Sequence, residues 1–277
     1  MIGILEQLKN QSLSISYTPP LDIYSNSIAA FSVRKLRTAY EGPCMQIKNS
    51  SLTLIDVYFN STGYLDISAI PSGTWKVNKW YDQSGNGNDV YNNDYSASPN
   101  IKVSGVVPII NGKAAVEYFT GGTGASVYLR FISKIQVESL LAVCNAANFG
   151  IVNYIGYSGA DTDGFFLGGT FSGVNGFGVL KSGSIVVQNN SENTNQRLQS
   201  YYGGSTDRVY SDGANEAIRS SPFAAPFVLE LGRTIANGGG INASNTGGIQ
   251  EWIAFSDDKF SDKSGIEANM NSYFNVY

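Results

Sequence analysis

The sequence of 277 residues contains no histidine. This absence excludes Ser-His-Asp and Cys-His catalytic arrangements, together with zinc or copper sites that depend on imidazole ligands. Only two cysteines occur, Cys44 and Cys144, far below the density of a disulfide-stapled secreted scaffold. Their positions permit one disulfide without requiring it, and the sequence leaves that pairing open.

Charged residues are also scarce, at 14% of the chain, and the formal net charge is −4. No run of basic residues is longer than Arg34-Lys35, so we do not expect the chain to bind nucleic acid. There is no apolar run of the roughly 18 residues that a membrane-spanning helix needs. The first residues lack the basic start of an export signal, so we expect neither membrane insertion nor export.

Glycine and tyrosine are abundant, with 31 and 17 residues, and hydrophobic residues make up 42% of the chain. This composition is typical of short strands joined by tight turns. Strand-like runs alternate with turn signals such as Ser182-Gly183 and Asp212-Gly213. The short spacing favours an all-β sandwich over parallel βαβ units, and such sandwiches reach this length as one domain.

The two ends of the chain differ from the middle. Residues 1–25 hold an amphipathic helix candidate and then a polar stretch that ends at Pro19-Pro20. We predict an N-terminal arm there, used either for attachment to a larger assembly or for packing on its own domain, and a sandwich over residues 26–277. Residues 28–40 fit a short helix or an extended strand equally well. Residues 261–274 predict a helix, with apolar side chains recurring on one face.

The most distinctive stretch is WYDQSGNGND at residues 80–89. It resembles a motif of fungal α-L-arabinofuranosidase B catalytic domains and of the laminin-G-like, concanavalin-type jelly rolls of phage virion proteins. Residues 29–36, 111–116 and the closing helix stand in the same order, and the resemblance covers about residues 28–277, loosely after Tyr118. It implies a two-sheet antiparallel jelly-roll sandwich, concanavalin-like, with a short N-terminal arm and a short C-terminal helix.

Elementary chemistry predicts how the motif folds. Its glycines permit positive φ in a tight loop, its Asp and Asn side chains can bond backbone amides, and its two aromatic residues anchor the loop to the core. The same oxygen-rich loop offers calcium ligands as an alternative, although their spacing matches no EF-hand. The predicted structural motif consists of Trp80, Tyr81, Asp82, Gln83, Ser84, Gly85, Asn86, Gly87 and Asn88.

Carboxylate chemistry remains open to a chain without histidine. A glycosidase needs two carboxyls about 5–10 Å apart, one protonated and one ionised. The arabinofuranosidase resemblance would place the nucleophilic Glu near residues 161–169 and the acid/base Asp within 233–240, but the first stretch has no Glu and the second has no carboxylate. Glu251 and the pair Asp161/Asp163 remain as candidates, each with a structural role as the favoured interpretation. We therefore predict a protein that is not an enzyme, with a carboxylate glycosidase as the alternative.

Sandwiches of this type usually bind sugar on rim loops or on a concave sheet, where an aromatic ring stacks on the sugar and amides or carboxylates bond its hydroxyls. The alternative is that tyrosine fills strands and asparagine fills turns. The candidate carbohydrate-binding residues are Tyr154, Tyr157, Asp161, Asp163, Tyr201, Tyr202, Asn237 and Asn242.

The arm, the sandwich motif and the low charge lead to a functional hypothesis. We predict a phage virion structural protein, located on the capsid or tail surface as a capsid decoration, head fibre or tail-fibre module. Its expected partners are other virion proteins through the arm, further copies of itself in a homo-oligomer, and carbohydrate on the host surface. The alternatives are an arabinofuranosidase-like glycoside hydrolase and a soluble carbohydrate-binding lectin.

Overall fold

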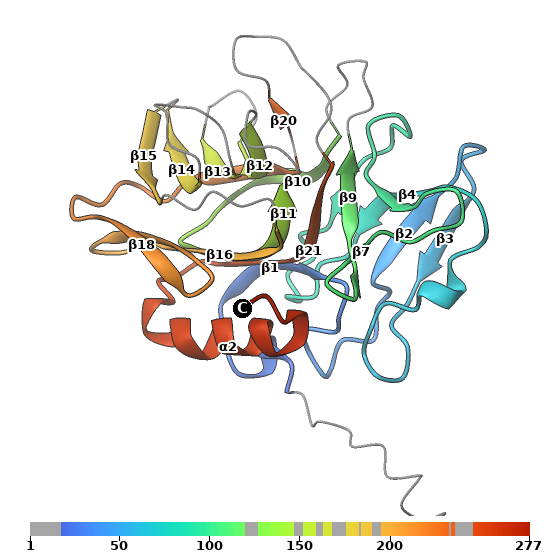
Figure 1. The fold of residues 1–277 in the computed structure, drawn as a ribbon, viewed down its shortest axis with the longest axis horizontal. Helices are drawn as coiled ribbons and strands as arrows, with labels where there is room; N and C mark the ends of the chain where they lie inside the picture. Colours follow the sequence, from blue (N-terminus) through green and yellow to red (C-terminus); the bar gives the residue numbers. More distant parts are fainter. Residues whose placement is uncertain are drawn as a thin grey trace, which may run out of the picture.

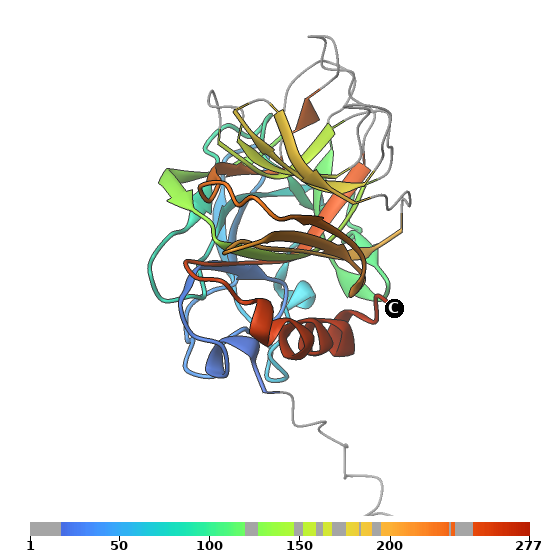
Figure 2. The ribbon, with the colours of Figure 1, turned by 90° about the vertical axis from the view of Figure 1, so that its left-hand side faces the viewer.

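The computed structural model describes residues 18–119, 127–146, 152–158, 163–167, 176–182, 184–189, 195–232, 234–235 and 246–277. The predicted arm helix lies outside these residues, as do the site candidates Asp161, Asn237 and Asn242. The described part consists of two layers of antiparallel strands with α2 (Lys263–Phe274) below them (Figures 1 and 2). The predicted all-β, two-sheet antiparallel sandwich with a short C-terminal helix is confirmed.

The sheet nearest α2 has the strand order β1, β21, β11, β16, β17, β18, and every neighbouring pair is antiparallel. A further strand, β9, pairs with the first residues of β21, while β1 pairs with its last residues. The strands are β1 (Ser27–Ser32), β9 (Val116–Phe119), β11 (Ser139–Ala146), β16 (Arg197–Tyr202), β17 (Asp207–Ser211), β18 (Ala214–Arg219) and β21 (Thr246–Phe255).

The second sheet has the order β10, β19, β12, β13, β14, β15, with β20 beside β12. It is also antiparallel throughout. Its strands are β10 (Leu129–Gln136), β12 (Val152–Tyr157), β13 (Gly164–Leu167), β14 (Phe177–Lys181), β15 (Ser184–Gln188), β19 (Phe227–Leu231) and β20 (Thr234–Ile235).

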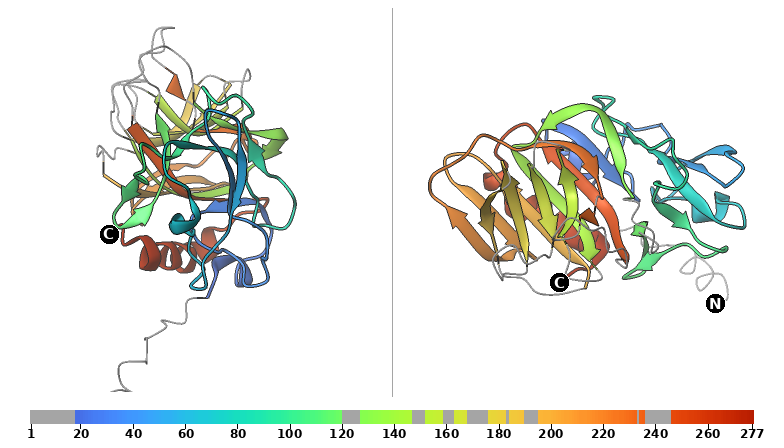
Figure 3. Two further views of the ribbon diagram at one scale, coloured as in Figure 1. Left: turned by 90° about the vertical axis from the view of Figure 1, so that its right-hand side faces the viewer. Right: turned by 90° about the horizontal axis from the view of Figure 1, so that it is seen from above.

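A lobe of short strands joins the two sheets, and in the view from above it stands to one side as blue and cyan strands (Figure 3). Its central strand β4 pairs with β2, β5 and β6; β5 continues to β10 of the second sheet and β6 to β9 of the first. The remaining elements are β2 (Met45–Lys48), β3 (Leu54–Val57), β4 (Trp75–Trp80), β5 (Val90–Tyr91), β6 (Asn100–Lys102), the hairpin β7 (Ile109–Ile110) and β8 (Lys113–Ala114), and the 3-10 helices η1 (Pro20–Asp22), η2 (Ile67–Ala69) and η3 (Phe260–Asp262).

Aromatic packing holds the two sheets and the lobe together. Phe31 lies 5.9 Å from Trp80 and 5.8 Å from both Phe131 and Trp252, measured between ring centroids. These rings come from β1, β4, β10 and β21, and each residue is at most 2% exposed. Large buried aromatic rings each contribute roughly 150–250 Å² of buried surface, so this cluster links strands of both sheets and of the lobe.

The structure tests the predictions made for segment 28–40 and for the C-terminal helix. The ambiguous segment 28–40 begins as a strand, because β1 pairs along its length with β21. In α2 the predicted apolar face of Ile266, Met270 and Phe274 is fully buried. Among the helices that the structure describes, none has the length and apolar character needed to cross a bilayer.

Both cysteines are buried and free, so they do not form the disulfide that the sequence left open. Burial raises the pKa of each thiol, and a thiol kept protonated is a poor nucleophile.

Candidate functional site

The loop that follows β4 contains the sequence motif, and Asp82 is its organising residue. One carboxylate oxygen accepts hydrogen bonds from the backbone N–H groups of Ala30 (2.9 Å) and Ser84 (2.8 Å). The other accepts from the Ser84 hydroxyl (2.6 Å) and the Asn88 N–H (2.9 Å). The carboxylate, 5% exposed, therefore closes its own loop and fastens it to β1.

The next residues complete this attachment. Gln83, fully buried, accepts from the Leu36 N–H at 2.7 Å and donates to the Arg34 carbonyl at 3.1 Å. Asn86 and Asn88 donate to the carbonyls of the first β1 residues, each at 2.7 Å. The sequence predicted bonds to backbone amides for these two asparagines, whereas their amide groups face carbonyls.

The predicted backbone of the loop is confirmed: Gly85 and Gly87 have φ of 92° and 72°. Trp80 is fully buried, as expected of an anchor, and the Tyr81 hydroxyl donates to Asp56 at 2.9 Å. Within the described residues, no group of three or more Cys, Asp or Glu side chains is arranged to hold a metal ion. The four hydrogen bonds accepted by Asp82 give the motif a structural role, called the structural lock below: they close the loop and fasten it to β1.

Glu251, a carboxylate candidate of the sequence, forms a buried ion pair. Arg34 donates to both of its oxygens, Nε to Oε2 at 2.6 Å and Nη2 to Oε1 at 2.7 Å, and the Ser32 hydroxyl donates to Oε2 at 2.7 Å. Both members of the pair are at most 1% exposed. A carboxylate enclosed in this way has no room for a substrate, so its role is structural.

Asp163 also has structural partners. It lies 2.6 Å from Lys181 Nζ and accepts a hydrogen bond from the Ser182 N–H at 2.9 Å. Its side chain is largely buried at the turn between β14 and β15. Its predicted companion Asp161 lies outside the described residues, so the structure places only Asp163 of the predicted carboxylate pair.

The predicted sugar-stacking tyrosines occupy core positions. Tyr201 and Tyr202 are fully buried in β16, and their hydroxyls donate to Asp207 (3.0 Å) and Glu267 (3.2 Å). Tyr157 is 8% exposed, and the side chain of Tyr154 lies outside the described part. A ring enclosed by protein presents no face to a sugar, so the stacking role predicted for Tyr201 and Tyr202 does not fit their burial.

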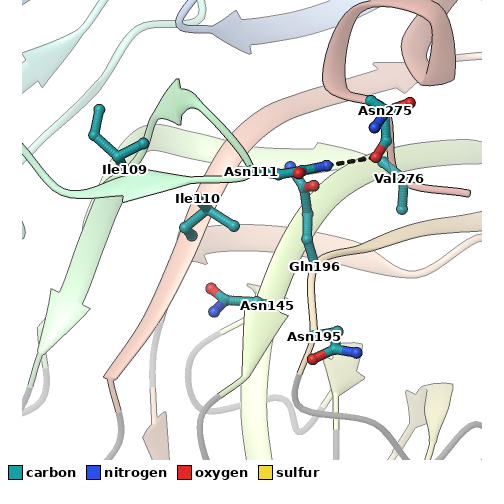
Figure 4. Close-up of a pocket in the computed structure, with 8 residues that line it drawn as sticks. All are labelled: Ile109, Ile110, Asn111, Asn145, Asn195, Gln196, Asn275 and Val276. Carbon is teal, nitrogen blue, oxygen red and sulfur yellow. Dashed lines mark hydrogen bonds between the residues drawn. The ribbon is translucent and has the colours of Figure 1, made fainter.

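An open surface pocket of about 590 Å³ lies where four separate segments meet (Figure 4). These segments are the β7–β8 hairpin, the end of β11, the two residues just before β16 and the tail that follows α2. This open pocket, called the amide pocket below, is lined by Ile109, Ile110, Asn111, Asn145, Asn195, Gln196, Asn275 and Val276. Five of these eight side chains are carboxamides, and the other three are aliphatic.

Local sequence positions two walls of the amide pocket. Asn111 and Gly112 have φ of 49° and 76°, the backbone of a type I′ hairpin turn that Asn-Gly favours. From this turn the Asn111 amide donates to the Phe274 carbonyl at 2.9 Å and to the Asn275 carbonyl, so it holds the tail beside the hairpin. On the opposite wall the Asn145 side chain accepts from the Gly248 N–H at 2.7 Å.

The chemistry of the lining is uniform. Each carboxamide can both donate and accept a hydrogen bond, and no described lining residue carries a charge or an aromatic ring. Such a surface suits an uncharged ligand with many hydroxyls. Sequence reasoning missed this pocket because its residues come from distant segments; the Asn111-Gly112 turn was the one local signal that could have pointed to it.

Two carboxyls elsewhere have raised pKa values. Burial is the main cause for Glu138, on the connection between β10 and β11, and the nearby charges of Asp207 and Asp258 raise its pKa further. Burial also raises the pKa of Asp207, although hydrogen bonds from Phe223 and Tyr201 oppose that shift. A carboxyl that keeps its proton at higher pH is what a general acid requires.

Solved structures with a similar fold include arabinofuranosidases. One of them is an arabinofuranosidase complexed with arabinofuranosyl-α-1,2-xylobiose, 16% identical to this chain with a TM-score of 0.63. The match covers 91% of this chain and 64% of the arabinofuranosidase chain. Another is a GH54 α-L-arabinofuranosidase mutant soaked with 4-nitrophenyl α-L-arabinofuranoside, 17% identical with a TM-score of 0.61. That match covers 91% of this chain and 65% of the other. The likeness shows a shared fold.

The chain thus spans about two thirds of the length of these structures. No protein-family model matches it, and neither does any curated protein. The comparisons support the sandwich fold that the arabinofuranosidase resemblance implies, while its laminin-G-like and virion part remains a prediction.

Proposed function

We propose that this protein binds carbohydrate in the amide pocket. The observation that carries the proposal is the lining of five carboxamides and three aliphatic side chains, within a fold shared with arabinofuranosidases. Sugar hydroxyls pair with groups that donate and accept at once, and carboxamides do both. The volume of about 590 Å³ falls in the usual range for small-molecule sites.

The physical chemistry of the lining favours a neutral sugar over other ligands. Without a charged side chain among its described residues, the amide pocket has nothing to offset the desolvation of an anionic or cationic ligand. Ile109, Ile110 and Val276 offer aliphatic contact to the C–H face of a sugar ring. Hydrogen bonds, not ring stacking, would therefore supply most of the specificity.

A glycan array followed by NMR titration tests this proposal. Arabinofuranosyl-α-1,2-xylobiose and xylobiose are suitable first ligands because one of them is bound in a structure of the same fold. Asn195→Trp should weaken binding more than about 10-fold by filling the mouth of the pocket, since Asn195 is exposed and lines it. Asn93→Trp, at another exposed position, is the matched control. An array without any saturable signal would refute the proposal.

Glycoside hydrolysis is the second candidate function. It is favoured by the fold of the similar structures and by the raised pKa values of Glu138 and Asp207. Release of 4-nitrophenolate from 4-nitrophenyl α-L-arabinofuranoside measures it directly. Activity that disappears in Glu138→Gln would support hydrolysis through this carboxyl, whereas folded wild-type protein that releases no product would rule out hydrolysis of this substrate.

Display on a phage virion is a separate hypothesis that rests on the sequence. It predicts a homo-oligomer, attachment through the N-terminal arm and a location on the capsid or tail surface. Light scattering of the purified protein and mass spectrometry of virions test it. A monomer that is absent from virions would contradict it and would favour the soluble lectin.

A further inference from the structure

The orientation of one carboxamide in the amide pocket is fixed by a second carboxamide behind it. Gln250, on β21, donates through its Nε2 to the carbonyls of Ile110, Lys113 and Ala114, each at 3.1 Å. Carbonyl oxygens only accept, so the NH₂ group of Gln250 must face the β7–β8 hairpin. Its Oε1 must then face the other way, toward Gln196.

The orientation of the Gln250 amide also determines that of the Gln196 amide. Because Gln250 presents an oxygen, Gln196 must present its NH₂ group, and its Nε2 donates to Gln250 Oε1. The Oε1 of Gln196 is thereby turned away from Gln250. It is buried and has no hydrogen-bond donor among the described residues. The residue as a whole is 9% exposed and lines the amide pocket (Figure 4).

A buried acceptor without a donor is costly, and folded proteins rarely leave one. Reorienting the amide does not relieve the cost, because it would place two oxygens, or two NH₂ groups, against each other. Because Gln196 lines the amide pocket, a ligand bound there is a source of the missing donor. With no charged group among the described lining residues, a hydroxyl is a better donor there than an ammonium group.

We propose that Gln196 Oε1 is the specificity-determining acceptor of the amide pocket and that it receives a hydrogen bond from one particular hydroxyl of the bound sugar. This inference rests on the proposed function, and it adds which hydroxyl-bearing ligands are accepted and which are rejected. A site built to bond a hydroxyl rejects the analogue that lacks it, because the acceptor is then left buried and unpaired. Loss of that one hydroxyl should weaken binding about 10- to 100-fold.

The test combines changes in the ligand with a change in the protein. Methyl α-L-arabinofuranoside and its 2-, 3- and 5-deoxy derivatives are titrated by NMR into the wild-type protein and into Gln196→Met, which has similar volume and no acceptor. One deoxy sugar should bind the wild type about 10-fold more weakly or worse than the parent sugar does, while Gln196→Met should bind both equally weakly. Gln136→Met, at an exposed glutamine of β10, is the matched control and should keep wild-type discrimination.

The outcomes separate the two proposals. If neither this panel nor the glycan array shows binding to the wild type, the carbohydrate function itself fails. A second outcome is that the parent sugar binds and all three deoxy sugars bind the wild type with a Kd within about twofold of the parent's. Ordered water then satisfies Gln196, and only the present inference is overturned. The deoxy series needs no variant, so the test stands even where Gln196→Met does not fold.

Discussion

Replacing Asp82 by asparagine should be far more destabilising than the same change in an ordinary turn. The substitution keeps one acceptor oxygen and puts an NH₂ group in place of the other, which accepts from the Ser84 hydroxyl and the Asn88 N–H. Hydrogen bonds to charged groups contribute about 1.5–3 kcal/mol each. Losing two of them, with the Asn88 N–H left facing a donor, should cost about 3–5 kcal/mol.

Asp94 supplies a matched control. It makes the same local turn, accepting from the Ser96 N–H at 2.8 Å and the Ser96 hydroxyl at 2.7 Å, but it is exposed. Asp94→Asn should therefore cost less than about 1 kcal/mol, because water replaces the lost bonds. The difference between the two substitutions measures what Asp82 contributes by fastening the loop to β1.

Urea denaturation and thermal melts, each with and without calcium, provide the assay. At about 2–4 °C per kcal/mol, Asp82→Asn should lower Tm by about 10 °C. Equal small losses in both variants would refute the structural-lock argument. A wild-type Tm that rises with calcium, and a variant Tm that does not, would show that the loop is the calcium site that the sequence offered as an alternative.

Three further predictions concern Glu251, Asp207 and Gly232. Glu251→Gln should cost about 3–5 kcal/mol in urea denaturation because it leaves Arg34 charged and buried, whereas Arg34→Met combined with Glu251→Leu should recover most of that loss. Burial raises the pKa of Asp207 in the folded protein, so as pH rises the unfolded chain loses this proton first. The stability of the wild type, measured against that of Asp207→Asn, should therefore fall as pH rises from about 4 through the raised pKa. Gly232→Ala should cost at least about 2 kcal/mol, because φ is +82° and the added methyl would overlap the Tyr118 ring.

Each of these has a contradicting result. Additive losses for the Arg34 and Glu251 variants would show that the pair does not act as a unit. A pH-independent difference between Asp207→Asn and the wild type would remove the linkage argument. Gly105→Ala, at φ +87° with open space around the glycine, separates backbone strain from overlap and should cost clearly less than Gly232→Ala.

The fold class was predictable because its signals are local. Turn dipeptides such as Asp212-Gly213 and short apolar runs predict antiparallel strands, and Asp212 and Gly213 do have positive φ. The α2 face was predictable for the same reason, since 3.6-residue periodicity places Ile266, Met270 and Phe274 on one side. Segment 28–40 was not, because its strand depends on pairing with β21, more than 200 residues away.

The candidate site was far less predictable. The sequence identified Tyr201 and Tyr202 by residue type and loop context, but residue type does not say which side of a strand faces a second sheet. Both tyrosines are buried with hydroxyl partners, whereas the amide pocket includes Asn145 and Gln196, which no pattern marked.

By itself the sequence determined the absence of histidine chemistry, the all-β class, the C-terminal helix and the tight loop at residues 80–89, because each depends on residue type or on near neighbours. Tertiary structure alone decided that Asp82 bonds the backbone of β1 and that Gln83 bonds the Leu36 N–H, each about 50 residues away. It also decided that Gln196, which lines the amide pocket, donates to Gln250 on a distant strand. Such contacts depend on which distant strands lie side by side, and local patterns carry no information about that pairing.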